Sequence, residues 1–180
     1  MIWRCLDWMT SITQSRIAIL HFSVSPCLRV SVVKIELMSH PPRNSHDVLL
    51  RVRYAETDKM GVVYHSNFFV WMEIGRVELM RSLGFDYKQM ELEDDCHLPV
   101  VDARCRYKSP AYYDEEIVVR TELRNLRDSL IHFGYNILRQ RDGVVLAEAE
   151  TTHIVVNAKM EKRALPERYR TAFSAIKRTR

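Results

Sequence analysis

The 180-residue sequence is poor in several features that mark particular protein classes. Five glycines and six prolines are too few for a collagen-like, low-complexity or linker-rich chain. The four cysteines contain no Cys-x-x-Cys pair, which excludes a zinc ribbon or a dithiol redox motif of that spacing. Thiols without such pairing are typical of a reducing compartment, so we expect a cytoplasmic protein.

Long apolar runs and a strong charge of one sign are missing too. The apolar run 17–24 is interrupted by Ser23 and is shorter than the about 20 residues that span a bilayer, so we expect no transmembrane segment. A net charge of +4 is mild and does not by itself indicate nucleic acid. Two acidic residues and a Cys-His pair cluster at 94–97, but the sequence shows no second group of metal ligands to complete a site with them. We therefore expect no metal site and no cofactor.

What remains is the composition of a globular domain, with 47% hydrophobic and 28% charged residues. The basic excess lies at the two ends, 1–37 and 159–180, while the body between them is acidic. We divide the chain into an N-terminal extension (1–45), a folded domain (46–158) and a basic C-terminal tail (159–180).

The N-terminal extension shows no clear period. A signal peptide is disfavoured because Asp7 precedes the apolar run and Pro26 stands where cleavage would occur. Met38 opens a polar stretch before the first predicted strand, so we expect the functional protein to begin near Met38. The upstream residues would then be a mis-called start or a disordered extension.

The folded domain begins with an alternating apolar pattern over 48–54 that predicts a strand. A helix is predicted from Ser66 or Asn67, as N-cap, to Gly84, as its end. We expect Glu73 and Arg76 to form an ion pair on its solvated side, as Glu78 and Arg81 would. The apolar residues of this helix step by three and four: Phe68, Met72, Gly75, Leu79 and Leu83, widened by Trp71 and Val77.

After a short polar stretch, strand patterns dominate. They cover 98–107, 117–124, 131–137 and 144–156, with a hairpin turn at 141–143. One strand, one long helix and four strands in meander-like succession predict an α+β fold, in which an antiparallel sheet wraps around one central helix. One helix cannot cover both sheet faces, so apolar residues assigned to the open face predict a homodimer through the sheet or its edge: Val145, Ala147, Ala149 and Val155.

Polar and titratable residues concentrate where the first strand leads into the helix. A carboxylate there, Asp58, can act as nucleophile or general base. The helix start near His65 offers unpaired N–H groups that can stabilise an oxyanion, and Gly61 lets the backbone approach a ligand. These are the parts of an acyl-transfer site. The structural alternatives are an Asx turn for Asp58, a cap-region role for His65 and a core position for Tyr64.

The ordered motif Thr57-Asp58-x-x-Gly61-Val62-Val63-Tyr64-His65-x-Asn67 resembles the signature of hot-dog-fold acyl-CoA thioesterases of the 4-hydroxybenzoyl-CoA thioesterase type. It is most similar to the bacterial short-chain group associated with the Tol–Pal system. The resemblance continues through the helix, 98–101, 107–115 and 163–166, and so covers about 47–168.

This resemblance implies a hot-dog fold that works as a homodimer or homotetramer with sites at subunit interfaces. Asp58 would be the catalytic carboxylate and the backbone N–H near His65 the oxyanion contact. The implied reaction hydrolyses a short-chain or aromatic acyl-CoA to free acid and coenzyme A, without a metal; Asp58 either attacks the thioester or activates water. The implied substrate-binding residues are Gly61, Tyr64, Ser66 and Asn67.

This chain departs from the family pattern at Lys59 and Met60, which replace the small residues often found after the aspartate. One branch of hot-dog thioesterases carries its carboxylate on the central helix, but we interpret Glu73 as a structural residue. A hot-dog hydratase would need a histidine and acid pattern that His65 alone does not supply. The alternative function from another class is a catalytically weak hot-dog module that binds acyl-carrier protein or other partners.

The basic tail has two interpretations. Lys159, Lys162 and Arg163 could contact the phosphates of coenzyme A, or the tail could be a solvated, frayed end. It lacks the interleaved aromatic residues of a nucleic-acid groove, so no nucleic-acid partner is expected.

Overall fold

The computed structural model describes residues 45–177, which form a five-stranded antiparallel sheet and three α-helices. The predicted extension 1–45 lies outside the described residues apart from Ser45, which begins the first strand. The elements in chain order are β1 (Ser45–Arg51), the 3₁₀ turn η1 (Tyr54–Glu56), α1 (Asn67–Ser82), α2 (Tyr87–Asp94), β2 (Val100–Tyr107), β3 (Glu116–Arg127), β4 (Leu130–Arg139), β5 (Val145–Ile154) and α3 (Glu167–Lys177).

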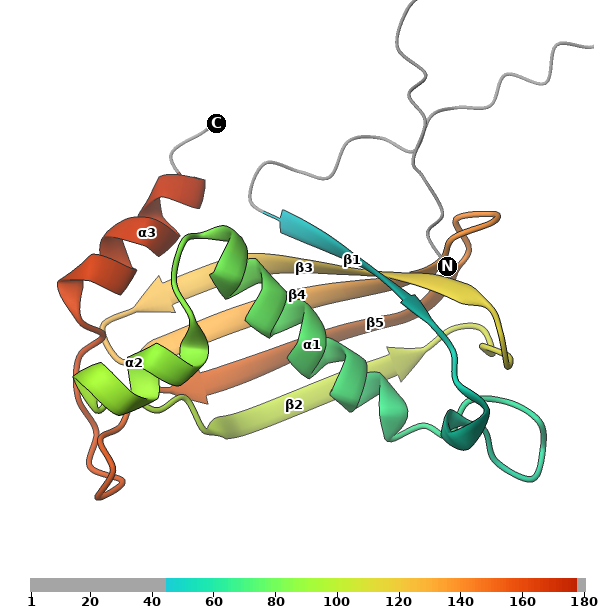
Figure 1. Ribbon diagram of the computed structural model, residues 1–180, viewed down its shortest axis with the longest axis horizontal. Coiled ribbons are helices and arrows are strands. Elements are labelled where there is room, and N and C mark those ends of the chain that lie inside the picture. The colour runs from blue at the N-terminus through green and yellow to red at the C-terminus, as the bar shows by residue number, and fades with distance from the viewer. Residues whose placement is uncertain (1–44, 178–180) are drawn as a thin grey trace, which may run out of the picture. The chain divides into compact units, whose positions relative to one another are not determined.

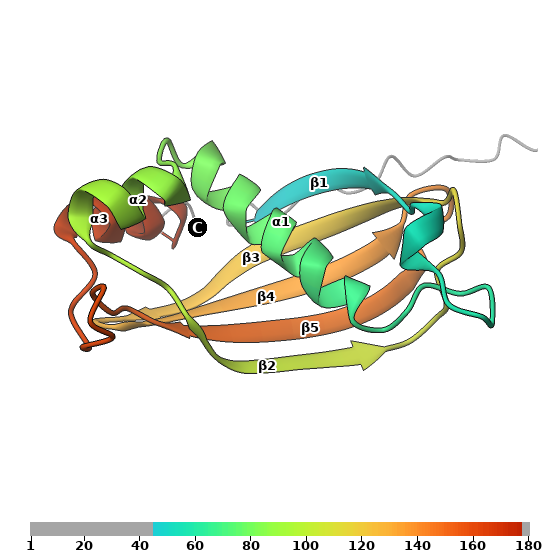
Figure 2. The same cartoon turned by 60° about the horizontal axis from the view of Figure 1, so that its bottom comes forward.

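Helix α1 crosses one face of the sheet, which confirms the predicted α+β architecture (Figures 1 and 2). Its apolar residues repeat at helical spacing and so form one packed side. At Gly75 the helix lies very close to β3, because a Cβ there would lie 2.4 Å from Thr121 Oγ1. Gly84 follows the helix with φ of +86°, the conformation expected after a helix end. The buried residues of α1 are Phe68, Trp71, Met72, Gly75, Leu79 and Met80.

The strands lie in the order β1-β3-β4-β5-β2, which differs from the predicted meander. Strands β3, β4 and β5 do follow one another as antiparallel neighbours. Strand β2 instead pairs with β5 at the far edge, with Cys105 opposite Ala149. The long connection 108–115 carries the chain from this edge back across the sheet to β3. One side of β2 is therefore left as an edge within residues 45–177.

The prediction about the open face of the sheet was wrong. Ala147, Ala149 and Val155 are buried in the same core as α1, and Ala149 lies opposite the buried Tyr135 of β4. Val145 is half-buried. Side chains alternate between the faces along a strand, so Glu148 and Glu150, the neighbours of Ala149, lie on the open face. That face is charged: Asp47 pairs with Arg120, Arg124 with Glu122, and Lys108 with Glu148.

Two helices at one end of the sheet were not predicted (Figure 1). The polar stretch after α1 is helix α2, capped by Asp86 and anchored by the buried Met90. The predicted tail contains α3, and its Tyr169 and Phe173 join the core, so the frayed-end interpretation was wrong. Within residues 45–177, no helix has the length and apolar character to cross a membrane.

Candidate active site

The segment between β1 and α1 folds into a tight hairpin that presents Asp58. Thr57 forms an isolated β-bridge with Val63, and the Asp58 N–H donates to Val62 O at 2.9 Å. Gly61, with φ of +77°, closes the turn by donating its N–H to Asp58 O at 2.9 Å. A residue with a side chain is strained at this φ, which accounts for glycine at position 61.

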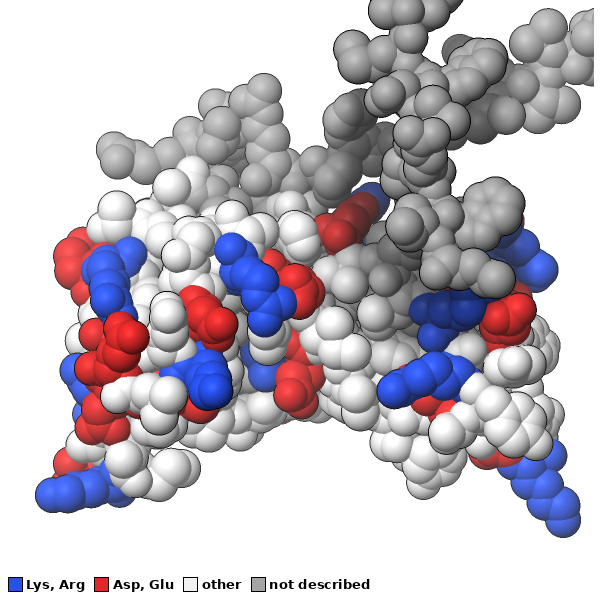
Figure 3. All heavy atoms as spheres, viewed as in Figure 1, with Lys and Arg blue, Asp and Glu red and all other residues white. Residues whose placement is uncertain are grey.

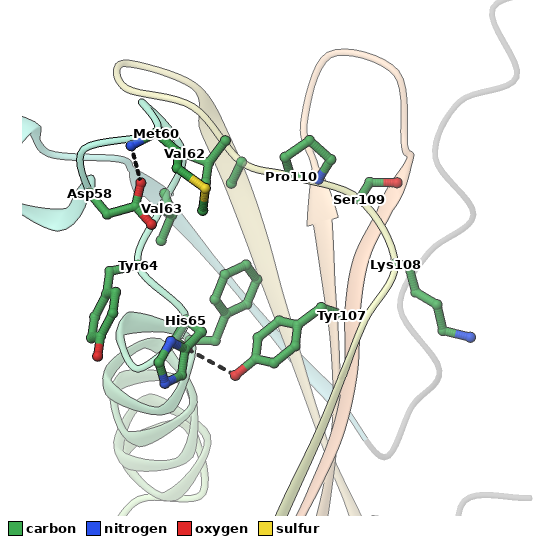
Figure 4. A pocket seen from close by; sticks show the side chains of 12 residues that line it. Asp58, Met60, Val62, Val63, Tyr64, His65, Tyr107, Lys108, Ser109 and Pro110 are labelled. Carbon is green, nitrogen blue, oxygen red and sulfur yellow. Dashed lines mark hydrogen bonds between the residues drawn. The ribbon is translucent and has the colours of Figure 1, made fainter.

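The two oxygens of the Asp58 carboxylate have different surroundings. Its Oδ1 accepts the Met60 N–H at 2.7 Å, which is the bond of an Asx turn (Figure 4). Its Oδ2 has no hydrogen-bond partner among residues 45–177. One oxygen is thus held by the loop, and the other is available to a substrate or water.

The start of α1 provides backbone donors beside this carboxylate. Tyr64 O accepts the Asn67 N–H at 3.0 Å, and the N–H groups of His65 and Ser66 donate to no other described residue. The Tyr107 hydroxyl donates to His65 O at 3.0 Å, which orients the peptide that carries the Ser66 N–H (Figure 4). Two oriented, unpaired N–H groups at a helix start can stabilise negative charge on a carbonyl oxygen.

A cavity of about 490 Å³ joins Asp58 to the helix start. Asp58, Tyr64 and His65, three of the residues predicted for the site, line it together. The cavity is within the size range of small-ligand sites and is mostly apolar. Its other lining residues are Met60, Val62, Val63, Phe68, Tyr107, Lys108, Ser109, Pro110 and Ala111.

Three residues predicted to bind substrate do not line the cavity. Gly61 forms the turn described above, and Ser66 is the N-cap residue of α1 without a side-chain capping bond. Asn67 instead donates its side-chain N–H to Glu56 O at 2.7 Å. These residues therefore shape the loop and the helix start.

The predicted coenzyme A contacts lie elsewhere in the subunit. The segment between β5 and α3, which carries Lys159, Lys162 and Arg163, is at the opposite end of the sheet from the start of α1 (Figure 1). Arg163 donates from Nη1 to Asp94 O at 2.9 Å and Asp95 O at 3.0 Å, so it binds the carboxyl end of α2. On the face shown in Figure 3, basic and acidic side chains are interspersed.

The predicted Glu73–Arg76 pair is not formed. Glu73 is exposed, whereas Arg76 turns inward and its Nη1 lies 3.3 Å from Nε2 of the buried His153. The Glu78–Arg81 ion pair is present, as predicted. The part of the chain that the structure describes contains no group of three or more His, Cys, Asp or Glu residues arranged to hold a metal.

Two residues of the site region had no role in the sequence-based interpretation. Tyr107 closes one wall of the cavity and contacts Phe68, with ring centroids 5.1 Å apart. Glu56 is buried under the hairpin and bonds to Arg53 and Trp71. The signal for Glu56 was an acid three residues after Arg53 and directly before the Asp58 motif, a spacing that allows the two side chains to pair.

Comparison with known proteins identifies the family. Residues 52–173 match the model of the Thioesterase-like superfamily. The putative acyl-CoA thioesterase YneP of Bacillus subtilis is 41% identical over 124 residues, which are 69% of this chain and 86% of that protein. The acyl-CoA thioester hydrolase YbgC of Escherichia coli is 31% identical over 119 residues, covering 66% and 87% of the two chains.

The fold comparison agrees. The DHNA-CoA thioesterase structure from Staphylococcus aureus superposes with a TM-score of 0.70 at 28% identity, covering 74% of this chain and 91% of that one. The predicted hot-dog fold and the predicted family are thereby confirmed. The chain belongs to the Thioesterase-like superfamily.

Proposed function

We propose that this protein hydrolyses acyl-CoA thioesters in the cavity between the Asp58 loop and the start of α1. The observation that carries the proposal is that Asp58, with its free carboxylate oxygen Oδ2, lines the same cavity as His65, whose unpaired N–H begins the pair of donors that the adjoining Ser66 N–H completes. The family and the names of the relatives support it.

In this proposal, the N–H groups at the helix start bind the thioester carbonyl oxygen and stabilise the negative charge that develops on it. Asp58 Oδ2 either attacks the carbonyl carbon or removes a proton from the attacking water. The C–S bond then breaks, and the thiolate leaves as coenzyme A after taking up a proton. If Asp58 attacks, the acyl group is left on Asp58 as an anhydride, which water then hydrolyses to the free acid and the carboxylate. If Asp58 acts as a base, the water that it deprotonates becomes part of the free acid directly, and the proton is passed to the leaving thiolate.

The acyl group would occupy the apolar part of the cavity. Met60, Val62 and Pro110 line it together with the rings of Phe68 and Tyr107. A volume of about 490 Å³ suits a short-chain or aromatic acyl group. An acyl-CoA panel that includes acetyl, butyryl, benzoyl and palmitoyl thioesters tests this preference, and fastest turnover of the palmitoyl thioester would contradict it.

The decisive experiment measures free thiol released from this panel by the wild type and by Asp58→Ala. We expect turnover by the wild type and loss of nearly all of it in the variant. Asp86→Ala is the matched control, because Asp86 Oδ1 accepts the Lys88 N–H in the same i to i+2 contact at the start of α2. Equal rates for Asp58→Ala and wild type would remove Asp58 from the mechanism. Absence of turnover on every thioester would favour a module that binds acyl-carrier protein.

We further propose that two copies pair through the exposed edge of β2, as a homodimer. Along β2, the N–H groups of successive residues point alternately toward and away from β5. The Lys108 N–H donates to Leu146 O of β5, so the Ala103 N–H, on the other alternation, points away from β5. Val101 and Tyr107 are exposed on the same strand. Ala103→Pro removes only an outward donor and should shift the protein toward a monomer in analytical ultracentrifugation. An unchanged sedimentation coefficient would exclude this edge.

Antiparallel pairing of two β2 strands would bring the partner's β5–α3 segment toward the cavity. Lys162 lies in that segment and forms an isolated β-bridge with Val156. Val156 forms a second β-bridge with His97, just before β2, so Lys162 lies near the start of β2. We propose that Lys159 and Lys162 of the partner subunit contact coenzyme A phosphates. Lys159→Glu with Lys162→Glu should raise KM for acyl-CoA and leave turnover of an acyl-N-acetylcysteamine unchanged, since that thioester lacks phosphates. Lys88→Glu, on exposed α2, is the control.

We also propose a cytoplasmic location. The two cysteines of the described region, Cys96 and Cys105, are free thiols, as expected in a reducing compartment.

A further inference from the structure

Glu56 is a buried carboxylate two residues before Asp58. It is 5% exposed, whereas glutamate is ordinarily found at the protein surface. Its Oε2 accepts the Arg53 backbone N–H at 2.7 Å. Its Oε1 accepts Arg53 Nη2 at 2.8 Å and the indole N–H of Trp71 at 3.1 Å. Burying a charge is unfavourable unless it is paired and hydrogen-bonded, and these three donors meet that condition.

The backbone of the same residue makes the second set of contacts. Glu56 O accepts the Asn67 side-chain N–H at 2.7 Å and the Tyr64 backbone N–H at 2.9 Å. Asn67 is the first residue of α1, and Trp71 lies one turn further along it. Glu56 therefore joins the base of the Asp58 hairpin to the first two turns of α1, through its side chain and its backbone at once.

The ionised form of Glu56 is the one that these contacts favour. Burial alone would raise its pKa, but the hydrogen bonds from Arg53 and Trp71 outweigh the effect and lower the pKa. Glu56 does not line the cavity, so a substrate in the cavity would not touch it.

We propose that Glu56 is a positioning residue: it fixes the Asp58 carboxylate relative to the oxyanion donors at the start of α1. The proposal rests on the proposed thioesterase function. The thioester carbonyl has to lie between these two groups, and a misplacement of about 1 Å can reduce the rate about 100-fold. Substrate binding through coenzyme A does not depend on that distance. Loss of Glu56 should therefore lower kcat and leave KM nearly unchanged.

The test compares two variants with one matched control. Glu56→Gln keeps an oxygen for the Trp71 indole but presents an amide to the Arg53 N–H, and Trp71→Phe removes the indole donor while keeping a ring. Glu78→Gln is the control, because Glu78 also pairs with an arginine three residues away, on the far half of α1. We expect both test variants to lose at least about tenfold in kcat with KM within about twofold, and the control to match the wild type.

A second measurement separates this proposal from the proposed function. In ¹H–¹⁵N NMR spectra of the full chain, the amide signals of Asp58, Met60 and His65 should shift in Glu56→Gln and Trp71→Phe and not in Glu78→Gln. If the wild type is active, an unchanged kcat in Glu56→Gln overturns the positioning role, and so does a rise in KM that equals the fall in kcat. If the wild type hydrolyses no thioester, the proposed function fails, and unshifted amide signals would then overturn the structural part of this proposal as well.

Discussion

Two polar regions lie along α1, and they use similar groups for opposite purposes. At the start of the helix, Asp58 keeps a free oxygen, and the N–H groups of His65 and Ser66 are unpaired beside a cavity. In the middle of the helix, Arg76 lies against the fully buried His153. The first region leaves donors and an acceptor free beside a cavity, whereas the polar groups of the second mostly pair with one another, with Arg76 Nε left as a buried donor without a partner among the described residues.

The buried region forms a connected network. His153 Nδ1 lies 2.9 Å from Leu98 O, which can only accept, so Nδ1 carries the proton and Nε2 is the acceptor. Nε2 lies 3.0 Å from Thr151 Oγ1, and Thr151 Oγ1 lies 2.9 Å from the Tyr135 hydroxyl. A neutral histidine thus faces the Arg76 guanidinium where a carboxylate would be usual. Such a network stabilises one packing arrangement of α1 on the sheet. The contrast between the two regions predicts different effects for four changes.

The largest effect is expected from Asp58→Asn. Asn can still accept the Met60 N–H, so the free energy of unfolding should stay within about 0.5 kcal/mol of the wild type. The acyl-CoA hydrolysis rate should fall about 10²–10⁴-fold, because an amide is neither a nucleophile nor a base. Glu73→Gln, a change of the exposed carboxylate on α1, is the control and should leave the rate unchanged. A comparable rate loss in that variant would indicate that Glu73, on α1, is the catalytic carboxylate.

Acidification should act on the buried region. Burial, and then the charge of Arg76, lower the pKa of His153 from 6.5 to about 4. The unfolded chain therefore takes up a proton near pH 6.5 that the folded chain resists until about pH 4. The contribution of the neutral His153 to the free energy of unfolding is therefore fully present above about pH 6.5. About 3 kcal/mol of this contribution is lost as the pH falls to about 4.

Urea unfolding at several pH values between 4 and 7 measures this loss. His153→Asn keeps a donor for Leu98 O but does not titrate, so its stability should depend less on pH than that of the wild type. Equal pH dependence of the two proteins would show that other groups govern the acid response.

The two regions also differ in how far the sequence predicted them. The hairpin motif is local, so Asp58, Gly61 and the helix start could be placed from consecutive residues. The Arg76–His153 contact joins residues 77 positions apart, and i, i+3 spacing alone suggested Glu73 as the partner of Arg76. Which face of β5 packs against α1 also depends on contacts between residues far apart in the sequence, so the face assigned to Ala147 and Ala149 was wrong.

An intermediate effect is expected from Gly75→Ala, which disturbs the packing between the two regions. The added Cβ would lie 2.4 Å from Thr121 Oγ1 and 2.9 Å from Val119 Cγ1. Overpacking of this kind costs about 1–3 kcal/mol, and the better helix propensity of alanine offsets about 1 kcal/mol of that. Thermal unfolding should show net destabilisation, while the rate per folded molecule at low temperature stays close to the wild type. Equal or higher stability would show that α1 can shift away from β3.

The smallest effect is expected from Tyr107→Phe, which removes a single hydroxyl at the open region. The ring stays packed on Phe68, and the bond to His65 O is lost together with a weaker contact to the Cys105 thiol. One hydrogen bond contributes about 1 kcal/mol, so kcat should fall about fivefold if that bond orients the Ser66 N–H toward the thioester. Tyr112→Phe is the matched control, since the Tyr112 hydroxyl has no hydrogen-bond partner among residues 45–177 and does not line the cavity. A kcat loss shared by both variants would trace the effect to the general loss of a polar group near the loop, whereas a loss confined to Tyr107→Phe assigns it to the orientation of the helix start.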